Sequence, residues 1–149
     1  GIRRSGTMKT IQFFIPGKPV GKERPRTGGR GIIYTPKKTV QYERYARDRY
    51  HLEAGTYRYP EGTAIRLTVK AVYPIPESWT KAKKQAAKEG KLIPGKPDGD
   101  NILKIIADAL NGEAYDDDRN IYRMEIEKEY GIYPEDTGVT VILSEKPEE

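Results

Sequence analysis

Carboxylates gather in one short stretch of this chain, and they are its side chains best suited to chemistry. Asp98 and Asp100 stand two residues apart, Lys104 follows, and the run Asp116–Asp118 comes later. Carboxylates brought close together repel one another unless a cation offsets their charge. Sites made only of oxygen ligands suit Mg²⁺ or Mn²⁺. The pattern therefore predicts a divalent-metal site, with Lys104 beside it.

A short helix must position these two acidic groups. Apolar residues recur at helical spacing from Asn101 to Asn111, and Gly112 ends the pattern. Asp98 and Asp100 stand at its start, and the later aspartates stand just before a predicted strand over 121–130. A helix followed by a returning strand can bring the second acidic group towards the first.

Each acidic residue also has an ordinary structural explanation. Asp100 suits the N-cap of the helix, and Asp98 suits the positive end of the helix dipole. Lys104 could pair with Asp100 or Asp108 four residues away, and three consecutive aspartates could form a turn. Taken together, these explanations leave several carboxylates crowded with no cation. A calcium loop of the EF-hand type is excluded, because its sixth position would be Leu103 instead of glycine.

The rest of the composition excludes other chemistry. The chain has no cysteine and a single histidine, His51, which rules out disulfides, zinc–thiolate sites, thiol catalysis and a multi-histidine metal site. We expect His51 to lie on the surface of a helix. The absence of cysteine suits a reducing cytoplasm, where we expect the protein to act. No apolar run reaches the roughly 18 residues of a membrane span, so no membrane partner is expected.

Charge is divided unevenly along the chain. Residues 1–97 hold 22 Lys and Arg against 7 Asp and Glu, a balance of +15. Residues 98–149 hold 5 against 15, a balance of −10. This split predicts a polyanionic partner, a nucleic acid, together with an acidic site. The candidate phosphate contacts are Lys18, Lys22, Arg24, Arg26, Arg30, Lys37, Lys38, Lys81, Lys83, Lys84 and Lys96.

Two aromatic residues of the basic half, Tyr34 and Trp79, are candidates for stacking on exposed bases. Ordinary packing in the core or on the surface is favoured over base stacking for both residues.

The hydrophobic periodicity predicts an α/β (α+β) fold. Alternating apolar residues predict strands over 9–15, 64–73, 121–130 and 137–143, with a hairpin near Ile32 to Tyr34. Helical spacing or capping predicts helices over 39–53, 78–90 and 101–111. We therefore expect one domain over residues 8–145, a mixed sheet covered by two to three helices. Residues 1–7 are interpreted as an added remnant or a disordered segment before Met8, and residues 146–149 as a frayed tail.

The acidic motifs resemble those of the RusA family of Holliday-junction resolvases. The shared features are a D-x-D-N helix start at Asp98, Lys104 on the same helix, and a D-D pair before a strand. The segments FFIPGKPVGKERPR and IYTPKK are similar to those of phage-borne members, which favours a prophage gene. The resemblance covers about Ile11 to Leu143.

The resemblance implies a Mg²⁺-dependent endodeoxyribonuclease, with Mn²⁺ as a substitute, that acts as a homodimer. Such an enzyme cuts two symmetric strands of a four-way junction in DNA recombination and repair. Position by position, it implies Asp98, Asp100 and Asp118 as metal ligands and Lys104, Asp100 and Asp117 as the catalytic set. Gly99 replaces a bulkier apolar residue, and the third aspartate leaves the ligand assignment within Asp116–Asp118 open.

Two other classes of protein remain as alternatives. A non-catalytic DNA-binding module explains the basic half but leaves an acidic cluster that would repel the phosphates. A metal-dependent nucleotide phosphohydrolase explains the cluster but not the long basic arm.

Overall fold

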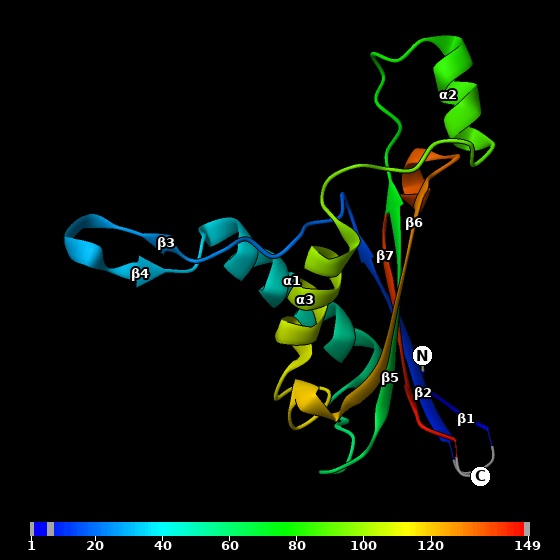
Figure 1. Ribbon diagram of the computed structural model, residues 1–149. Coiled ribbons are helices and arrows are strands. Elements are labelled where there is room, and N and C mark those ends of the chain that lie inside the picture. Colours follow the sequence, from blue (N-terminus) through cyan, green and yellow to red (C-terminus); the bar gives the residue numbers. More distant parts are fainter. Residues whose placement is uncertain (1, 6–7, 148–149) are drawn as a thin grey trace.

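A five-stranded mixed sheet forms the centre of the computed structural model, which describes residues 2–5 and 8–147 (Figure 1). The strand order is β1-β2-β7-β5-β6, and only the β5–β6 pair is parallel. The strands in chain order are β1 (Ile2–Ser5), β2 (Met8–Pro16), β5 (Ile65–Tyr73), β6 (Ile121–Tyr130) and β7 (Gly138–Glu145).

Two helices cover one face of this sheet. They are α1 (Lys37–Ala54) and α3 (Gly99–Leu110), and Figure 1 shows both on the same side of the strands. The third helix, α2 (Lys81–Lys88), stands beyond one end of the sheet. It begins later than the predicted start at residue 78, because its N-cap is Thr80, whose side chain accepts a hydrogen bond from the backbone N–H of Lys83. The expectation of a single α+β domain with a mixed sheet is confirmed.

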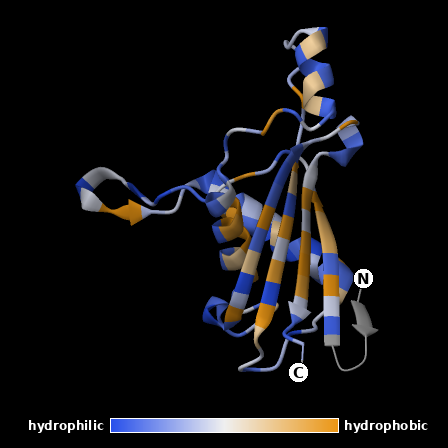
Figure 2. Ribbon diagram, turned by 45° about the vertical axis from the view of Figure 1, so that its right-hand side comes forward, coloured by the Kyte–Doolittle hydropathy of each residue, from blue (hydrophilic) through white to orange (hydrophobic). Residues whose placement is uncertain are grey.

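Alternation of residue type decides which face of the sheet is buried (Figure 2). On β5, Leu67, Val69 and Ala71 have no exposed area and face the helices, whereas Lys70 points to the open side. On α3, Ile102, Ile105 and Ile106 meet them. Burying one such side chain contributes roughly 1.5–3 kcal/mol, so this layer stabilises the position of α3.

Strand β6 departs from this pattern. A bulge between its pairings Ile121–Ile65 and Arg123–Arg66 takes Tyr122 out of the alternation, and Tyr122 is exposed. Met124 shares a face with Ile126 but is also exposed, while Ile126 packs against the core. The strand lies at the edge of the sheet. Ile126 lies beneath the start of α3, since an added Cβ on Gly99 would sit 3.2 Å from it.

A two-stranded hairpin extends away from the body (Figure 1). Its strands are β3 (Arg26–Thr27) and β4 (Ile33–Tyr34), which pair antiparallel as the predicted hairpin requires. We call residues 24–36 the arm.

The N-terminal segment differs from its expectation. Ile2–Ser5, which we expected to be an added or disordered segment, pair antiparallel with β2. Residues 1, 6, 7, 148 and 149 lie outside the described residues. None of the described helices is both long and apolar enough to cross a bilayer.

Candidate active site

The first two predicted acidic residues lie at the start of α3, and the later aspartates lie between α3 and β6. Asp98 is the N-cap of α3 without a side-chain capping bond, and Asp100 follows in the first turn. Lys104 and Asp108 follow at intervals of one turn. The helical rise of about 1.5 Å per residue sets the Cα atoms of Asp100 and Asp108 about 12 Å apart. We call Asp98, Asp100, Lys104, Asp108 and Asp118 the acidic strip.

Two hydrogen bonds hold the start of the strip in place. The Tyr73 hydroxyl donates a hydrogen bond of 2.5 Å to the Pro97 carbonyl, just before Asp98. Burial raises the pKa of Tyr73 to about 12, and the charge of Asp98 adds to the shift, so the hydroxyl stays protonated as a donor. The carbonyl of Asn101 accepts a bond of 2.9 Å from the backbone N–H of Lys22.

Tyr115 fixes the far end of the strip. Its buried hydroxyl donates to the Ala107 carbonyl at 2.7 Å. Gly112 turns the chain with a φ of +78°, and its N–H donates to the Tyr115 carbonyl at 2.9 Å. The chain therefore returns beside the last turns of α3 and delivers the later aspartates there.

Asp117 and Asp118 form a carboxylate pair. Burial raises the pKa of Asp118, and its hydrogen bond with Asp117 and the nearby charge of Asp108 raise it further, while Lys104 opposes the shift. The pKa of Asp117 is lowered, chiefly because its carboxylate accepts a hydrogen bond of 3.0 Å from the backbone N–H of Arg119. Two carboxylates that share one proton repel each other when both are charged, and a bound cation would offset this repulsion.

Asp116 has a separate partner. Its carboxylate lies 3.2 Å from the Arg58 guanidinium, and both side chains are exposed. The three consecutive aspartates therefore divide into an ion pair with Arg58 and the Asp117–Asp118 pair.

The donors suit Mg²⁺ in their chemistry. Mg²⁺ is usually held by one or two carboxylates together with water and substrate phosphates. The Asp117–Asp118 pair offers two carboxylates, with Asp108 and Lys104 close enough to influence Asp118. Within residues 2–5 and 8–147, no three His, Asp or Glu side chains converge as a ready metal site. Asp98 and Asp100 lie at the opposite end of α3 from the pair.

A groove lies between the start of the arm and the start of α3. Its volume is about 710 Å³, and Asp98 lines it together with four of the predicted phosphate contacts. We call it the lysine groove, after Lys18, Lys22, Lys38 and Lys96. Residues that stand 78 positions apart in sequence, from Lys18 to Lys96, thus meet beside the predicted metal ligand.

Lys22 differs from the other cations of the lysine groove. Its ammonium lies 3.1 Å from Asp108 and 3.2 Å from Glu43, and its side chain is only 18% exposed. Burial opposes its charge, but the hydrogen bonds to Asp108 and Glu43 outweigh burial and raise its pKa. Glu43 escaped the sequence analysis, because it carries no motif and joins Lys22 only in the folded chain.

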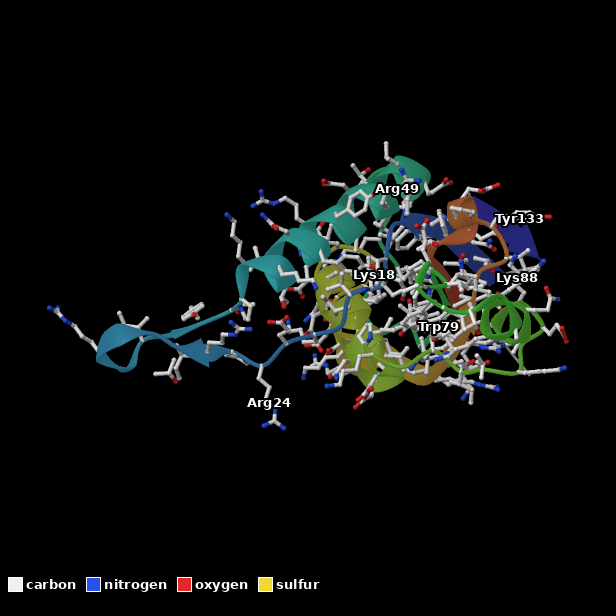
Figure 3. All side chains as sticks on the ribbon, turned by 90° about the horizontal axis from the view of Figure 1, so that it is seen from above. Lys18, Arg24, Arg49, Trp79, Lys88 and Tyr133 are labelled. Carbon is white, nitrogen blue, oxygen red and sulfur yellow. The ribbon has the colours of Figure 1, made fainter. Side chains whose placement is uncertain are left out.

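The predicted phosphate contacts on the arm and on α2 lie on two segments that project from the body of the protein. Arg24, Arg26 and Arg30 belong to the arm, and Figure 3 shows the Arg24 side chain pointing away from the body. Lys81, Lys83 and Lys84 lie on α2, where Lys83 stands 4.0 Å above the Trp79 ring. Trp79 also meets Tyr130 edge to face. Trp79 thus takes part in local packing.

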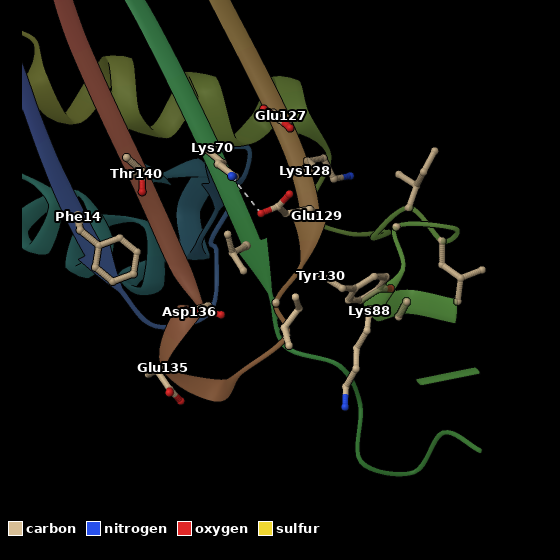
Figure 4. Close-up of a pocket in the computed structure, with 17 residues that line it drawn as sticks. Phe14, Lys70, Lys88, Glu127, Lys128, Glu129, Tyr130, Glu135, Asp136 and Thr140 are labelled. Carbon is tan, nitrogen blue, oxygen red and sulfur yellow. Dashed lines mark ion pairs between the residues drawn. The ribbon is translucent and has the colours of Figure 1, made fainter. Parts of the chain in front are cut away.

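A second hollow lies on the open face of the sheet (Figure 4). Its volume is about 680 Å³, and the ion pair between Lys70 and Glu129, at 3.1 Å, lies on its wall. Figure 4 shows α1 and α3 behind the strands, so the sheet separates this hollow from the acidic strip.

Comparison with known proteins gives a consistent result. The family model described as endodeoxyribonuclease RusA matches residues 16–143, a span that includes the acidic strip and the lysine groove. A relative in Bacillus subtilis (strain 168), "Uncharacterized protein YqaN", is 33% identical over 147 residues, which are 93% of this chain and 98% of the relative. This chain belongs to the RusA family of endodeoxyribonucleases, the Holliday-junction resolvases that its acidic motif resembles.

Proposed function

We propose that this protein binds a four-way DNA junction as a homodimer and hydrolyses one phosphodiester bond in each of two symmetric strands with Mg²⁺. The observation that carries the proposal is the acidic strip beside the lysine groove. Carboxylates alone would repel DNA, and lysines alone would only hold it. Their juxtaposition at α3 suits a cation that is held against a DNA phosphate. The reaction would serve DNA recombination and repair.

Each of the predicted ligands, and Lys104, would have its own role in the hydrolysis. Asp118, with Asp117 as ligand or support, holds the cation from the start of β6. Asp98 and Asp100 are the other two predicted ligands; they lie at the opposite end of α3, with Asp100 one turn before Lys104, and would hold a cation on the side of the lysine groove. When bound, Mg²⁺ or its substitute Mn²⁺ lowers the pKa of a water molecule and offsets charge on the phosphate. Lys104 stabilises the negative charge that develops on the phosphate oxygens.

The basic residues hold the backbone of the junction. Lys18, Lys38 and Lys96 line the lysine groove beside Asp98, where a phosphate bound by them would lie next to the cation. Lys37 and the lysines of α2 would contact the other double-stranded branches of the junction. Lys22 is set apart from this group, because its charge is already shared with Glu43 and Asp108. Such contacts position DNA without reading its sequence.

A homodimer suits the substrate. A four-way junction has two-fold symmetry, and paired cuts need two active sites at a fixed spacing, which a C₂ dimer supplies. Light scattering should give a mass of twice the 16.9 kDa of the chain. A monomeric mass both with and without the junction would contradict the proposed homodimer but not the proposed nuclease activity.

The central experiment compares cutting of a labelled four-way junction with cutting of a linear duplex, in Mg²⁺, Mn²⁺ or EDTA. Asp100→Asn and Asp118→Asn should bind the junction and fail to cut it. Asp116→Asn is the matched control and should cut as the wild type does, because Asp116 faces Arg58. Wild-type rates for Asp118→Asn, or equal cutting of linear duplex, would overturn the proposal.

A further inference from the structure

The arm presents apolar side chains to solvent. Ile32, Ile33 and Tyr34 are 63%, 72% and 48% exposed, and they follow one another in sequence. Figures 1 and 2 show this apolar strand standing away from the body of the protein. A two-stranded hairpin is only marginally stable in water, and exposed apolar groups of this kind mark interaction sites.

The tip of the arm is narrow. Gly28, Gly29 and Gly31 contribute no side chains there, so Arg30, with a φ of +63°, carries the only one between Thr27 and Ile32. The Gly28 N–H donates to the Ile32 carbonyl at 2.5 Å and closes the hairpin. The Tyr34 ring lies against Gly28, since a Cβ added there would sit 3.4 Å from the ring. The tip is thus thin, closed and flanked by aliphatic side chains.

The charge of the arm identifies the partner. The arm, residues 24–36, holds three arginines and no carboxylate, and Glu23 just before it pairs with Arg26 at 3.2 Å. Throughout the described residues, no ion pair joins a carboxylate to Arg24 or Arg30. A strongly basic hairpin repels a second copy of itself and attracts the phosphates that flank exposed bases.

We infer that the arm inserts its tip at the branch point of the junction, with Ile32 and Ile33 against unstacked bases and Arg24 and Arg30 on the adjoining phosphates. The inference rests on the proposed function and adds how the branch is recognised. Isoleucine is among the apolar residues that proteins insert between base steps, and bases at a branch point are already partly unstacked. The tip would therefore favour branched DNA over linear duplex.

The test uses the full chain in EDTA, so that binding is measured without cutting. The probes are a four-way junction with 2-aminopurine next to the branch point and a linear duplex of the same length. Ile32→Ser/Ile33→Ser should lower the preference for the junction about tenfold, the smaller end of what base stacking contributes, and should abolish the 2-aminopurine fluorescence increase. Its melting temperature should match the wild type, because both side chains are exposed.

Two further variants separate the apolar from the electrostatic contribution. Leu52→Ser/Ile93→Ser removes side chains that are 74% and 83% exposed outside the arm, and should behave as the wild type. Arg24→Ala/Arg30→Ala should weaken binding to both probes and reduce the salt slope by about 2. It should keep the fluorescence increase at saturation.

Two results would overturn the inference alone. One is a wild-type junction preference in Ile32→Ser/Ile33→Ser while the wild type itself prefers the junction. The other is a smaller mass by light scattering for this variant without DNA, which would assign the arm to self-association. If the wild type fails to prefer the junction, the proposed function falls and the inference falls with it.

Discussion

The Lys22 ammonium lies 3.1 Å from the Asp108 carboxylate, a contact that ties the segment before the arm to the last turn of α3. Glu43 of α1 holds the same ammonium at 3.2 Å. One cation therefore joins three elements that are far apart in sequence. It also offsets the charge of Asp108, which lies close enough to Asp118 to raise the pKa of that carboxyl.

Replacing this cation should cost stability. Lys22→Met leaves Glu43 and Asp108 facing each other with no positive charge between them, and we expect a loss of about 1–3 kcal/mol in the free energy of unfolding. Urea denaturation measures it. Lys38→Met is the matched control in the same groove, and Lys22→Met/Glu43→Gln should recover part of the loss. An unchanged midpoint for Lys22→Met would contradict the assignment.

A divalent cation should stabilise the protein. Mg²⁺ held by the Asp117–Asp118 pair would offset their mutual repulsion, and a ligand at 100 times its Kd adds about 2.7 kcal/mol. Differential scanning fluorimetry with increasing Mg²⁺ or Mn²⁺ should show a rising melting temperature that is absent in Asp118→Asn. The same rise in Asp118→Asn would place the ion elsewhere.

The turn after α3 should depend on the Tyr115 hydroxyl. Tyr115→Phe removes the bond to the Ala107 carbonyl and should cost about 0.5–1.5 kcal/mol. Because this turn delivers Asp117 and Asp118, cutting should also require more Mg²⁺. Tyr122→Phe, at an exposed position on β6, is the control. Loss of stability without any change in the Mg²⁺ requirement would separate the turn from the metal site.

Gly21 lets the chain pass close to the start of α3. A Cβ added there would lie 2.7 Å from the Cβ of Pro97 and 3.1 Å from that of Asn101. Gly21→Ala should therefore destabilise the protein by about 1–3 kcal/mol through overpacking, and junction binding should weaken as the lysine groove shifts. Gly29→Ala, where a Cβ meets nothing within 4 Å, should leave the melting temperature unchanged. Equal melting temperatures for the two variants would refute this account.

His51 should make stability depend on pH. Its hydrogen bond to the Gly55 carbonyl raises its pKa, and Glu113, 3.0 Å from Nε2, adds to the shift. A raised pKa in the folded state means that the contribution is present in full below the unfolded pKa of about 6.5 and is lost as the pH rises through the folded value. The melting temperatures of wild type and His51→Gln should thus differ more at pH 5.5 than at pH 8.5. An equal difference in melting temperature at both pH values would exclude a stabilising contribution from the protonated form of His51.

Local patterns predicted the elements well. The alternation from Ile65 to Tyr73 and the helical spacing within α3 each report directly which side chains face the core, because one face of each element must be buried. The exposure of Tyr122 and Met124 did not follow from their pattern. It depends on a bulge at Tyr122 and on β6 lying at the edge of the sheet, neither of which alternation along one strand can reveal.

The acidic and basic residue types along the chain were enough to predict a divalent-cation site and a polyanionic partner, because carboxylate oxygens suit hard cations and Lys and Arg attract phosphates. The spacing of the acidic motifs added the resemblance to the RusA family. Tertiary structure alone decided their neighbours. It pairs Asp116 with Arg58, so that Asp117 and Asp118 form a pair of their own. It also joins Lys22 to Asp108, 86 residues away in sequence. Contacts over such separations depend on the path of the whole chain, about which the spacing of residues within one element carries no information.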